Sequence, residues 1–190
     1  MKKYEFTGET KTVPFFFKDV TLHRIQAITS FANVVAGELG GWIEKEENLS
    51  HKGDAWVYGD AVVSGNAVVS ENAVVSENAV VSGDAEVRGN AVVRGNAVVS
   101  GDAVVRENAV VSGDAEVFSV RHVLVIGPIG SRNAFTTFYH DKDNEITVQC
   151  GCFIGKIDKF LKKVTQTHCD SKYALVYRAA VEVARLQIEL

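Results

Sequence analysis

The sequence predicts a mainly β protein built around a parallel β-helix, and three observations support this prediction. From Gly53 to Phe118 the chain consists of eleven consecutive hexads, without insertion or gap. The third residue of every hexad is Ala, and the fifth residue is Val. A strict period with two invariant small apolar positions is typical of a solenoid, because each unit can bury its apolar residues only against its neighbours.

Each hexad is expected to form a short strand followed by a corner. Side chains alternate between the two faces of a strand, so the third and fifth residues share the inward face and the fourth points outward. The first residue is Gly or Glu and the second is Asp or Asn, and these residue types suit a turn. A helix is excluded because it needs a spacing of about 3.6 residues.

Residues 1–52 are predicted to form an N-terminal β cap. The segments YEFTGET, VPFFFKDV and TLHRIQAI alternate in polarity and are typical of strands. The open end of a β-helix exposes an unpaired strand and needs such a cover. Glu47-Asn48-Leu49 matches the Glu-Asn-Ala places of a degenerate hexad. The residues expected to cover the first coil are Trp42, Leu49 and Trp56.

Residues 119–190 are predicted to form a small α+β domain, which a β-helix does not need merely to be closed. His122–Gly130 is expected to be a strand that ends in a Gly/Pro turn, and AFTTFYHDKDNEITVQCGCF is expected to be a hairpin. Two helices should follow, over Asp158–His168 and from Asp170 or Ser171 to Leu190. A functional site is therefore expected in this domain.

Composition argues against several classes of protein. The 190 residues carry a formal net charge of −4, so a nucleic-acid partner is not expected. The N-terminus lacks the apolar core of a signal peptide, and no stretch is long enough to span a membrane. Three cysteines are too few for a disulfide framework, which favours a cytoplasmic location.

The hexads resemble those of a known family. Valine, then Gly or Glu two residues on, then Ala four residues on, is the pattern of left-handed parallel β-helices such as the hexapeptide-repeat acyltransferases. The resemblance implies three hexads in each coil and a homotrimer. It also implies a catalytic histidine near the coils, for which His51 and His122 are candidates, with packing at the ends of the stack as the alternative. The hexads themselves contain no histidine and no insertion loop, which speaks against an acyltransferase.

The flanking segments carry a second resemblance. LGGWIEKEENLS, GPIGSRNAFTTFY, CGCFIG and DKFLKKVTQTH are similar to segments of a group of phage- and prophage-encoded hexapeptide-repeat proteins. This resemblance covers most of the chain and supplies no catalytic residues. It implies a protein made inside a bacterial host, where such accessory proteins often counter defence, either as sponges for nucleotide signals or by blocking a defence enzyme.

The candidate site centres on the turn Gly127-Pro128-Ile129-Gly130-Ser131-Arg132-Asn133. A Gly-rich turn after a strand can aim backbone N–H groups at an anion, and Arg132 can add a bidentate contact to phosphate or carboxylate. The turn lacks the Lys-Ser/Thr ending of a P-loop, and a plain surface turn is the alternative. The residues predicted to bind the ligand are Gly130, Ser131, Arg132, Asn133, Thr137, Tyr139, Cys152 and His168.

The cysteines and His168 allow other chemistry. Cys150 and Cys152 lie two residues apart, and Cys169 follows His168, which is not a familiar zinc spacing. No metal and no cofactor are therefore expected. A cysteine nucleophile activated by His168 and small buried thiols are the two alternatives.

Two surface features of the repeat could mediate contacts. The valines at fourth positions would form an exposed apolar wall, interpreted as an oligomer interface, with plain β-propensity as the alternative. Arg88 and Arg106 should lie one above the other and could contact an acidic partner or phosphate. Glu86 and Glu107 could instead neutralise this edge. The fourth-position valines are Val62, Val68, Val74, Val80, Val92, Val98, Val104 and Val110.

These observations together predict a protein that is not an enzyme. A trimeric β-helix scaffold is expected to bind and sequester a small anionic ligand, such as a linear or cyclic nucleotide signal, and so to counter bacterial defence. Two alternatives remain. The chain could be a hexapeptide-repeat acyltransferase, or it could be a structural virion protein or a direct inhibitor of a defence enzyme.

Overall fold

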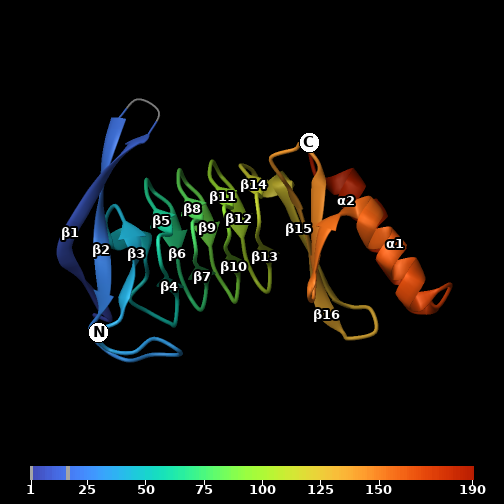
Figure 1. The fold of residues 1–190 in the computed structure, drawn as a ribbon, viewed down its shortest axis with the longest axis horizontal. Coiled ribbons are helices and arrows are strands. Elements are labelled where there is room, and N and C mark those ends of the chain that lie inside the picture. The colour runs from blue at the N-terminus through green and yellow to red at the C-terminus, as the bar shows by residue number, and fades with distance from the viewer. Residues whose placement is uncertain (1, 16–17) are drawn as a thin grey trace.

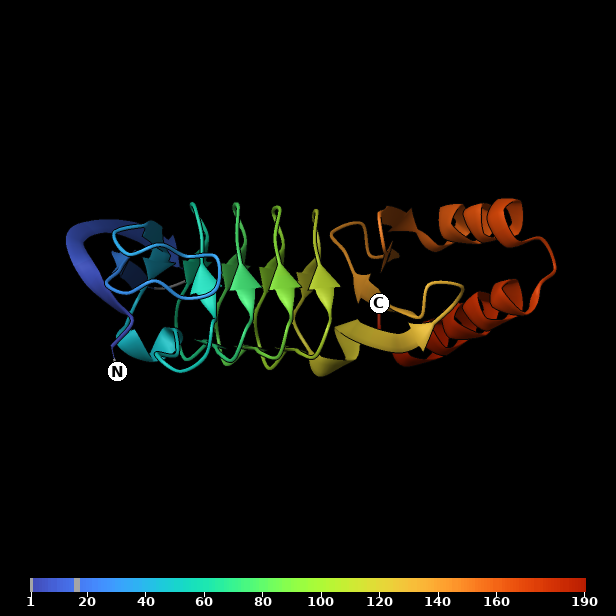
Figure 2. The ribbon, with the colours of Figure 1, turned by 90° about the horizontal axis from the view of Figure 1, so that it is seen from below.

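The protein consists of three parts that follow one another along a single axis (Figure 1). The computed structural model describes residues 2–15 and 18–190. An N-terminal hairpin is followed by a stack of β coils and then by an α+β unit at the far end (Figure 2). The predicted order of the parts is therefore confirmed.

The N-terminal part is a long antiparallel hairpin rather than three short strands. Strand β1 (Tyr4–Phe15) pairs with β2 (Lys18–Ala27). Strand β3 (Leu39–Ile43) pairs antiparallel with β2 and parallel with the first face of the repeat, so the hairpin and the β-helix share one sheet. Two residues of the predicted strand VPFFFKDV, Phe16 and Phe17, lie outside the described residues.

The repeat forms a parallel β-helix with three hexads in each coil. Pairs such as Val57 with Val75 and Val87 with Val105 join strands of neighbouring coils, and the paired residues are one coil of three hexads apart. The three faces contain the strand orders β3-β5-β8-β11-β14, β4-β7-β10-β13 and β6-β9-β12. The strands are β4 (Trp56–Val57), β5 (Val62–Val63), β6 (Val68–Val69), β7 (Val74–Val75), β8 (Val80–Val81), β9 (Glu86–Val87), β10 (Val92–Val93), β11 (Val98–Val99), β12 (Val104–Val105), β13 (Val110–Val111) and β14 (Glu116–Val117).

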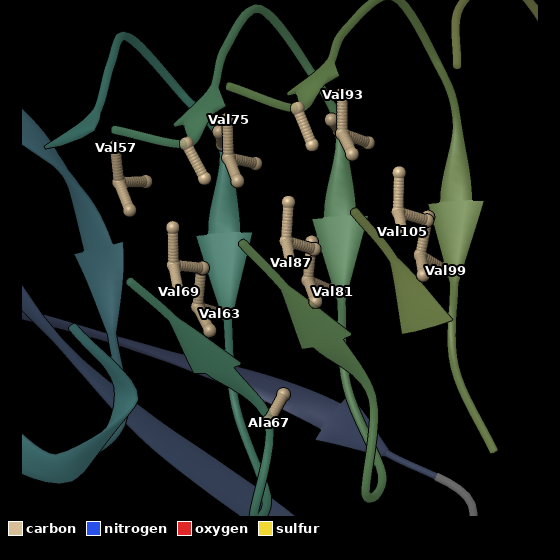
Figure 3. Close-up of a cluster of buried hydrophobic side chains, with 14 of the residues drawn as sticks. Val57, Val63, Ala67, Val69, Val75, Val81, Val87, Val93, Val99 and Val105 are labelled. Carbon is tan, nitrogen blue, oxygen red and sulfur yellow. The ribbon is translucent and has the colours of Figure 1, made fainter. Parts of the chain in front are cut away.

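The core of the β-helix contains the invariant alanines and valines. The Ala at position three and the Val at position five of every hexad are fully buried or nearly so. Figure 3 shows valines from all three faces, among them Val57, Val63 and Val69, pointing into one shared interior. Each fully buried valine contributes about 1.5–3 kcal/mol, so the repeated pair provides most of the stability of this part.

The β-helix begins before the first regular hexad. Ile43 pairs with Val63 and Leu49 bridges to Val69, so both residues take the place of the inward valine. The short helix η1 (Glu46–Asn48) precedes Leu49, which therefore does not take the Ala place that the sequence suggested. Leu49 and Trp56 do join the core, whereas Trp42 packs outside it in a separate cluster with Val20 and Leu22.

The fourth-position valines are distributed over three faces and do not form one wall. Val74 lies on one face, Val80 on the second and Val68 on the third. Most of them are half-buried, and Val68 is 36% exposed. An oligomer interface on these valines remains a prediction.

The C-terminal part is a four-stranded antiparallel sheet with two helices. The short helix η2 (Val120–His122) leads into the strand order β15-β16-β17-β18, and α1 and α2 pack together on one face of this sheet. The second helix ends at Gln187 rather than Leu190, and β18 was not foreseen. None of the helices in the described part of the chain is long and apolar enough to cross a membrane. The elements are β15 (Val123–Ile129), β16 (Ala134–His140), β17 (Ile146–Cys150), β18 (Phe153–Lys156), α1 (Ile157–His168) and α2 (Lys172–Gln187).

Candidate functional site

Strand β16 closes the end of the β-helix with one of its faces. The Val110 N–H donates to Thr137 Oγ1 at 3.0 Å, and Tyr139 Oη donates to the Ser112 carbonyl oxygen at 3.0 Å. Both Thr137 and Tyr139 are fully buried, and burial raises the pKa of the Tyr139 phenol. The structure therefore places these two predicted ligand residues in the cap of the β-helix, where they bond to the last coil.

A cavity of about 180 Å³ opens between the sheet and the two helices. The hairpin turn between β15 and β16 forms one wall, and the turn between β17 and β18 forms a second. The helices α1 and α2 form the remaining walls. The lining residues are Ser131, Arg132, Ala134, Cys150, Gly151, Cys152, Phe153, Phe160, Lys163, Val164, Thr167, His168 and Tyr177.

Four of the predicted ligand residues line this cavity together. Ser131 and Arg132 come from the first turn, Cys152 from the second and His168 from the end of α1. These residues lie up to 37 positions apart along the chain, and the sheet and helices bring them to one place.

Two further predicted residues shape the first turn without lining the cavity. Gly130 has a φ of +73°, and a Cβ atom at this position would lie 1.9 Å from Tyr177 Oη. Only glycine therefore allows the turn to approach α2 so closely. Asn133 also adopts a positive φ of 47°, which suits a turn residue.

Aromatic rings form the apolar part of the cavity. The Phe160 and Tyr177 rings meet edge to face with their centroids 5.6 Å apart, and His168 lies 5.7 Å from Tyr177. Phe153 lies 5.4 Å from Phe160. Phe160, Val164 and His168 recur at four-residue intervals, so they share one face of α1. Counting back from His168 in steps of four residues therefore identifies, from the sequence alone, side chains of α1 that line the cavity.

Polar groups are concentrated where the two turns meet α2. Cys150 Sγ lies 4.0 Å from Tyr177 Oη and accepts a hydrogen bond from Thr136 Oγ1 at 3.3 Å. Burial, reinforced by Cys150 and opposed by the charge of Arg132, raises the pKa of Tyr177 to about 12. Tyr177 is therefore a neutral phenol at pH 7 and can donate a hydrogen bond to an anion.

Two cations face the cavity without a carboxylate partner. The Arg132 side chain lies over Gly151. A Cβ atom added to Gly151 would be 3.5 Å from Arg132 Nη1. Lys163 approaches from α1. Within residues 2–15 and 18–190, no ion pair joins Arg132 or Lys163 to an acidic side chain. Sequence analysis missed Lys163 and Tyr177 as site residues, because the sequence does not show that the helices leave a cavity against the sheet.

The three cysteines differ in how exposed they are. All three are free thiols, with Cys150 half-buried and Cys152 and Cys169 exposed, so the prediction of small buried cysteines fails for two of them. In the part of the chain that the structure describes, no three His, Cys, Asp or Glu side chains are grouped as metal ligands.

The two histidines that flank the repeat pack at its ends. His51 Nδ1 accepts from the Lys3 N–H at 3.3 Å, and its ring stacks on Tyr4. His122 Nδ1 accepts from the Phe118 N–H at 3.2 Å, and its ring lies 4.8 Å from that of His140. Burial lowers the pKa of both His51 and His122. Neither histidine lines the cavity.

Comparison with known proteins finds a similarity to a named protein. The chain is 37% identical over 62 residues to "Uncharacterized acetyltransferase YdcK" of Escherichia coli (strain K12). The match covers 30% of this chain and 19% of that protein, so the chain spans less than a fifth of its relative. No family model matches the chain.

This relative and the fold together identify a hexapeptide-repeat β-helix protein. They also correct one prediction. The chain was expected not to be an enzyme, and the similarity to a protein named as an acetyltransferase contradicts that expectation.

Proposed function

We propose that the C-terminal cavity binds a small anionic ligand and that the hexapeptide β-helix is the scaffold that carries it. One observation carries the proposal, namely that Arg132 and Lys163 face an aromatic cavity and that neither pairs with a carboxylate among the residues the structure describes. A cation beside apolar walls interacts strongly with an incoming anion, because the walls exclude water and lower the local dielectric constant.

The chemistry of the lining defines the class of ligand. The Arg132 guanidinium can hold a phosphate or carboxylate with two parallel hydrogen bonds, and Lys163 can add a point charge. Tyr177 and His168 can donate further hydrogen bonds, and the rings of Phe153 and Phe160 offer faces or edges to a planar group. A ligand that combines a phosphate with a ring, as nucleotides do, meets all of these features.

The size of the cavity limits how much of the ligand is enclosed. At about 180 Å³ the cavity is smaller than the roughly 300–1,000 Å³ of pockets that enclose most of a drug-sized ligand. It therefore accommodates a phosphate group or one ring, and the rest of a larger nucleotide would extend into solvent. Sequestration of a nucleotide signal, a phage origin, a homotrimer and a cytoplasmic location all remain predictions that rest on the resemblances described above.

Isothermal titration calorimetry with inorganic phosphate, nucleoside monophosphates and cyclic mono- and dinucleotides tests the proposal. For whichever ligand binds, Arg132→Ala and Lys163→Ala should each lower the affinity by tenfold or more. A hydrogen bond to a charged group contributes about 1.5–3 kcal/mol, and each variant removes one. Lys162→Ala is the matched control, because Lys162 is the neighbour of Lys163 on α1 and does not line the cavity. Equal affinity for the control and the two test variants would contradict the proposal.

Acetyl transfer is the second candidate function, and the name of the relative favours it. In such a reaction an acceptor amine or hydroxyl attacks the carbonyl carbon of an acetyl thioester, loses its proton to a base, and releases the free thiol. His168 is the histidine that lines the cavity and is the candidate base.

Thiol release from acetyl coenzyme A, measured with amine and hydroxyl acceptors, distinguishes the two candidates. Acetyl transfer predicts acceptor-dependent release that His168→Ala abolishes and His122→Ala leaves intact. Release that is absent with every acceptor, or that survives in His168→Ala, would count against this candidate.

A further inference from the structure

One face of the β-helix ends earlier than the other two. The order β6-β9-β12 contains three strands, whereas the other faces continue to β13 and β14. The next strand over β12 would belong to the hexad that starts after Phe118. There the chain leaves the repeat and enters η2 and β15 instead.

The last strand of this face has an unpaired edge. One coil below, the N–H groups of Glu86 and Arg88 donate to the carbonyl oxygens of Ala103 and Val105, at 2.9 Å each. The equivalent groups of the last coil are the N–H groups of Val104 and Arg106. Among the residues that the structure describes, neither of these has an acceptor within hydrogen-bond distance.

The other two faces are closed differently. Val110 of β13 donates to Thr137, and the Glu116 carbonyl oxygen of β14 accepts from His140 Nδ1 at 2.8 Å. Strand β16 therefore covers two of the three edges and leaves β12 uncovered. Unpaired strand edges attract other strands, and proteins usually block them.

A cavity of about 400 Å³ lies along this edge, and we call it the β12 slot. Val104 of β12 and Val120, Val123 and Leu124 of the departing chain form its apolar walls. Arg88 and Arg106 lie one above the other at its rim, as predicted from their spacing.

The two arginines of the slot differ in their partners. Arg88 Nε pairs with Glu86 at 3.3 Å, whereas no ion pair of the described residues includes Arg106. The guanidinium of Arg106 is therefore free for a carboxylate brought by a ligand.

We propose that the β12 slot binds a short extended segment of another protein, which adds a strand to β12 and places a carboxylate against Arg106. The edge presents three main-chain groups in a row, namely the N–H and C=O of Val104 and the N–H of Arg106. An added strand of a parallel sheet pairs with this pattern of groups. A free carboxylate would meet the arginines but would leave the carbonyl group of Val104 without a donor. The column of outward residues on this face, Val68, Glu86 and Val104, alternates Val with Glu, so Glu is the residue that would continue it.

The probe is a blocked hexapeptide with the sequence Gly-Asp-Ala-Glu-Val-Phe, which repeats residues 113–118 of this chain. In the register of the β-helix its Glu lies over Val104, and the N–H of its Val donates to the Val104 carbonyl oxygen. Amide hydrogen exchange of the ¹⁵N-labelled full chain gives the direct readout. Binding should slow exchange at Val104 and Arg106 by tenfold or more.

Matched peptides and variants make the test specific. N-methylation of the peptide Val should abolish binding, whereas N-methylation of its Glu, whose N–H faces away from β12, should not. Replacing that Glu by Gln, or Arg106→Gln in the protein, should weaken binding about tenfold, since a charge-assisted pair is lost. Arg94→Gln is the control at the same hexad position outside the slot.

Three results would overturn the inference. Unchanged exchange at Val104 and Arg106 with millimolar peptide would exclude strand addition. Equal binding of the two N-methylated peptides would exclude hydrogen bonding between the peptide and the main chain of β12. Exchange that slows with protein concentration alone would show that a second copy of this chain fills the slot, and not another protein.

Discussion

Three corner residues of the β-helix adopt a backbone conformation that suits glycine. Glu71, Glu77 and Glu107 have φ values of 60°, 62° and 59°, at the hexad position that is Gly elsewhere. A residue with a Cβ atom loses about 1–2 kcal/mol in this left-handed region. Glu77→Gly should therefore raise the free energy of unfolding by about 1 kcal/mol in urea titrations. Glu86→Gly, in a strand, is the control and should lower the free energy of unfolding. A loss of stability in Glu77→Gly would show that the Glu side chain contributes more than its backbone costs.

A second prediction at this scale concerns acid stability. Asp141 is 5% exposed and lies 2.6 Å from Lys156 Nζ, which also pairs with Asp143 and Glu145. Burial opposes ionisation of Asp141, but hydrogen bonds from Lys156 and Thr147 outweigh it and lower its pKa. A lowered folded-state pKa gives stability that is present above the unfolded pKa of about 3.9 and is lost as the pH falls further.

Asp141→Asn should consequently lower stability near pH 7 by about 2 kcal/mol, the contribution of a hydrogen bond to a charged group. It should also reduce the loss of stability below about pH 4. Asp143→Asn is the control, because Asp143 is exposed. Thermal unfolding followed from pH 7 to pH 3 provides the comparison, and identical profiles for Asp141→Asn and the unsubstituted protein would contradict this account.

At the scale of the element, the two valines of one strand have different roles. In β10, Val93 is fully buried in the core, and Val92 is half-buried on the outer face. Val93→Ala leaves a cavity that the stacked coils cannot close, so it should lower the free energy of unfolding by about 2–3 kcal/mol. Val92→Ala should lower it by less than half as much. Equal losses would show that the core and the outer face contribute alike.

Strand β16 carries two of the predicted ligand residues, Thr137 and Tyr139, on the face that does not border the cavity. Its side chains alternate between the β-helix, which Thr137 and Tyr139 contact, and the helices, which Phe138 contacts. The sequence shows this alternation but does not show which face meets which neighbour. Ser131 and Arg132 lie in a turn, where the local sequence determines the backbone, and the structure places both at the cavity.

At the scale of the whole molecule, the sequence predicts those parts whose structure depends on residues close together in the chain. The β-helix, the C-terminal hairpin and both helices follow from periods, turns and spacing, and the structure confirms them. The cavity depends on how α1 and α2 dock on the sheet, which is why Lys163 and Tyr177 were missed. The unpaired edge of β12 arises from the point at which the chain leaves the repeat, which no single hexad reveals.

The homotrimer belongs to this scale as well and remains a prediction. Sedimentation equilibrium at micromolar concentration should give three times the chain mass of 20.6 kDa. Val92→Glu places a charge on an outer face and should dissociate such a trimer if that face is the interface. A single species of the chain mass would reject the trimer and would leave the cavity within one chain unaffected.

The binding of an anion in the C-terminal cavity is the central claim, and NMR of the histidine rings tests it most directly. During titration with a nucleoside monophosphate, the His168 ring signals should shift and saturate. The His51 signals should stay in place, because His51 packs at the far end of the β-helix. Arg132→Ala should remove the shift at the same ligand concentration. His168 signals that do not move with any phosphate or carboxylate ligand, or that move together with those of His51, would contradict the account.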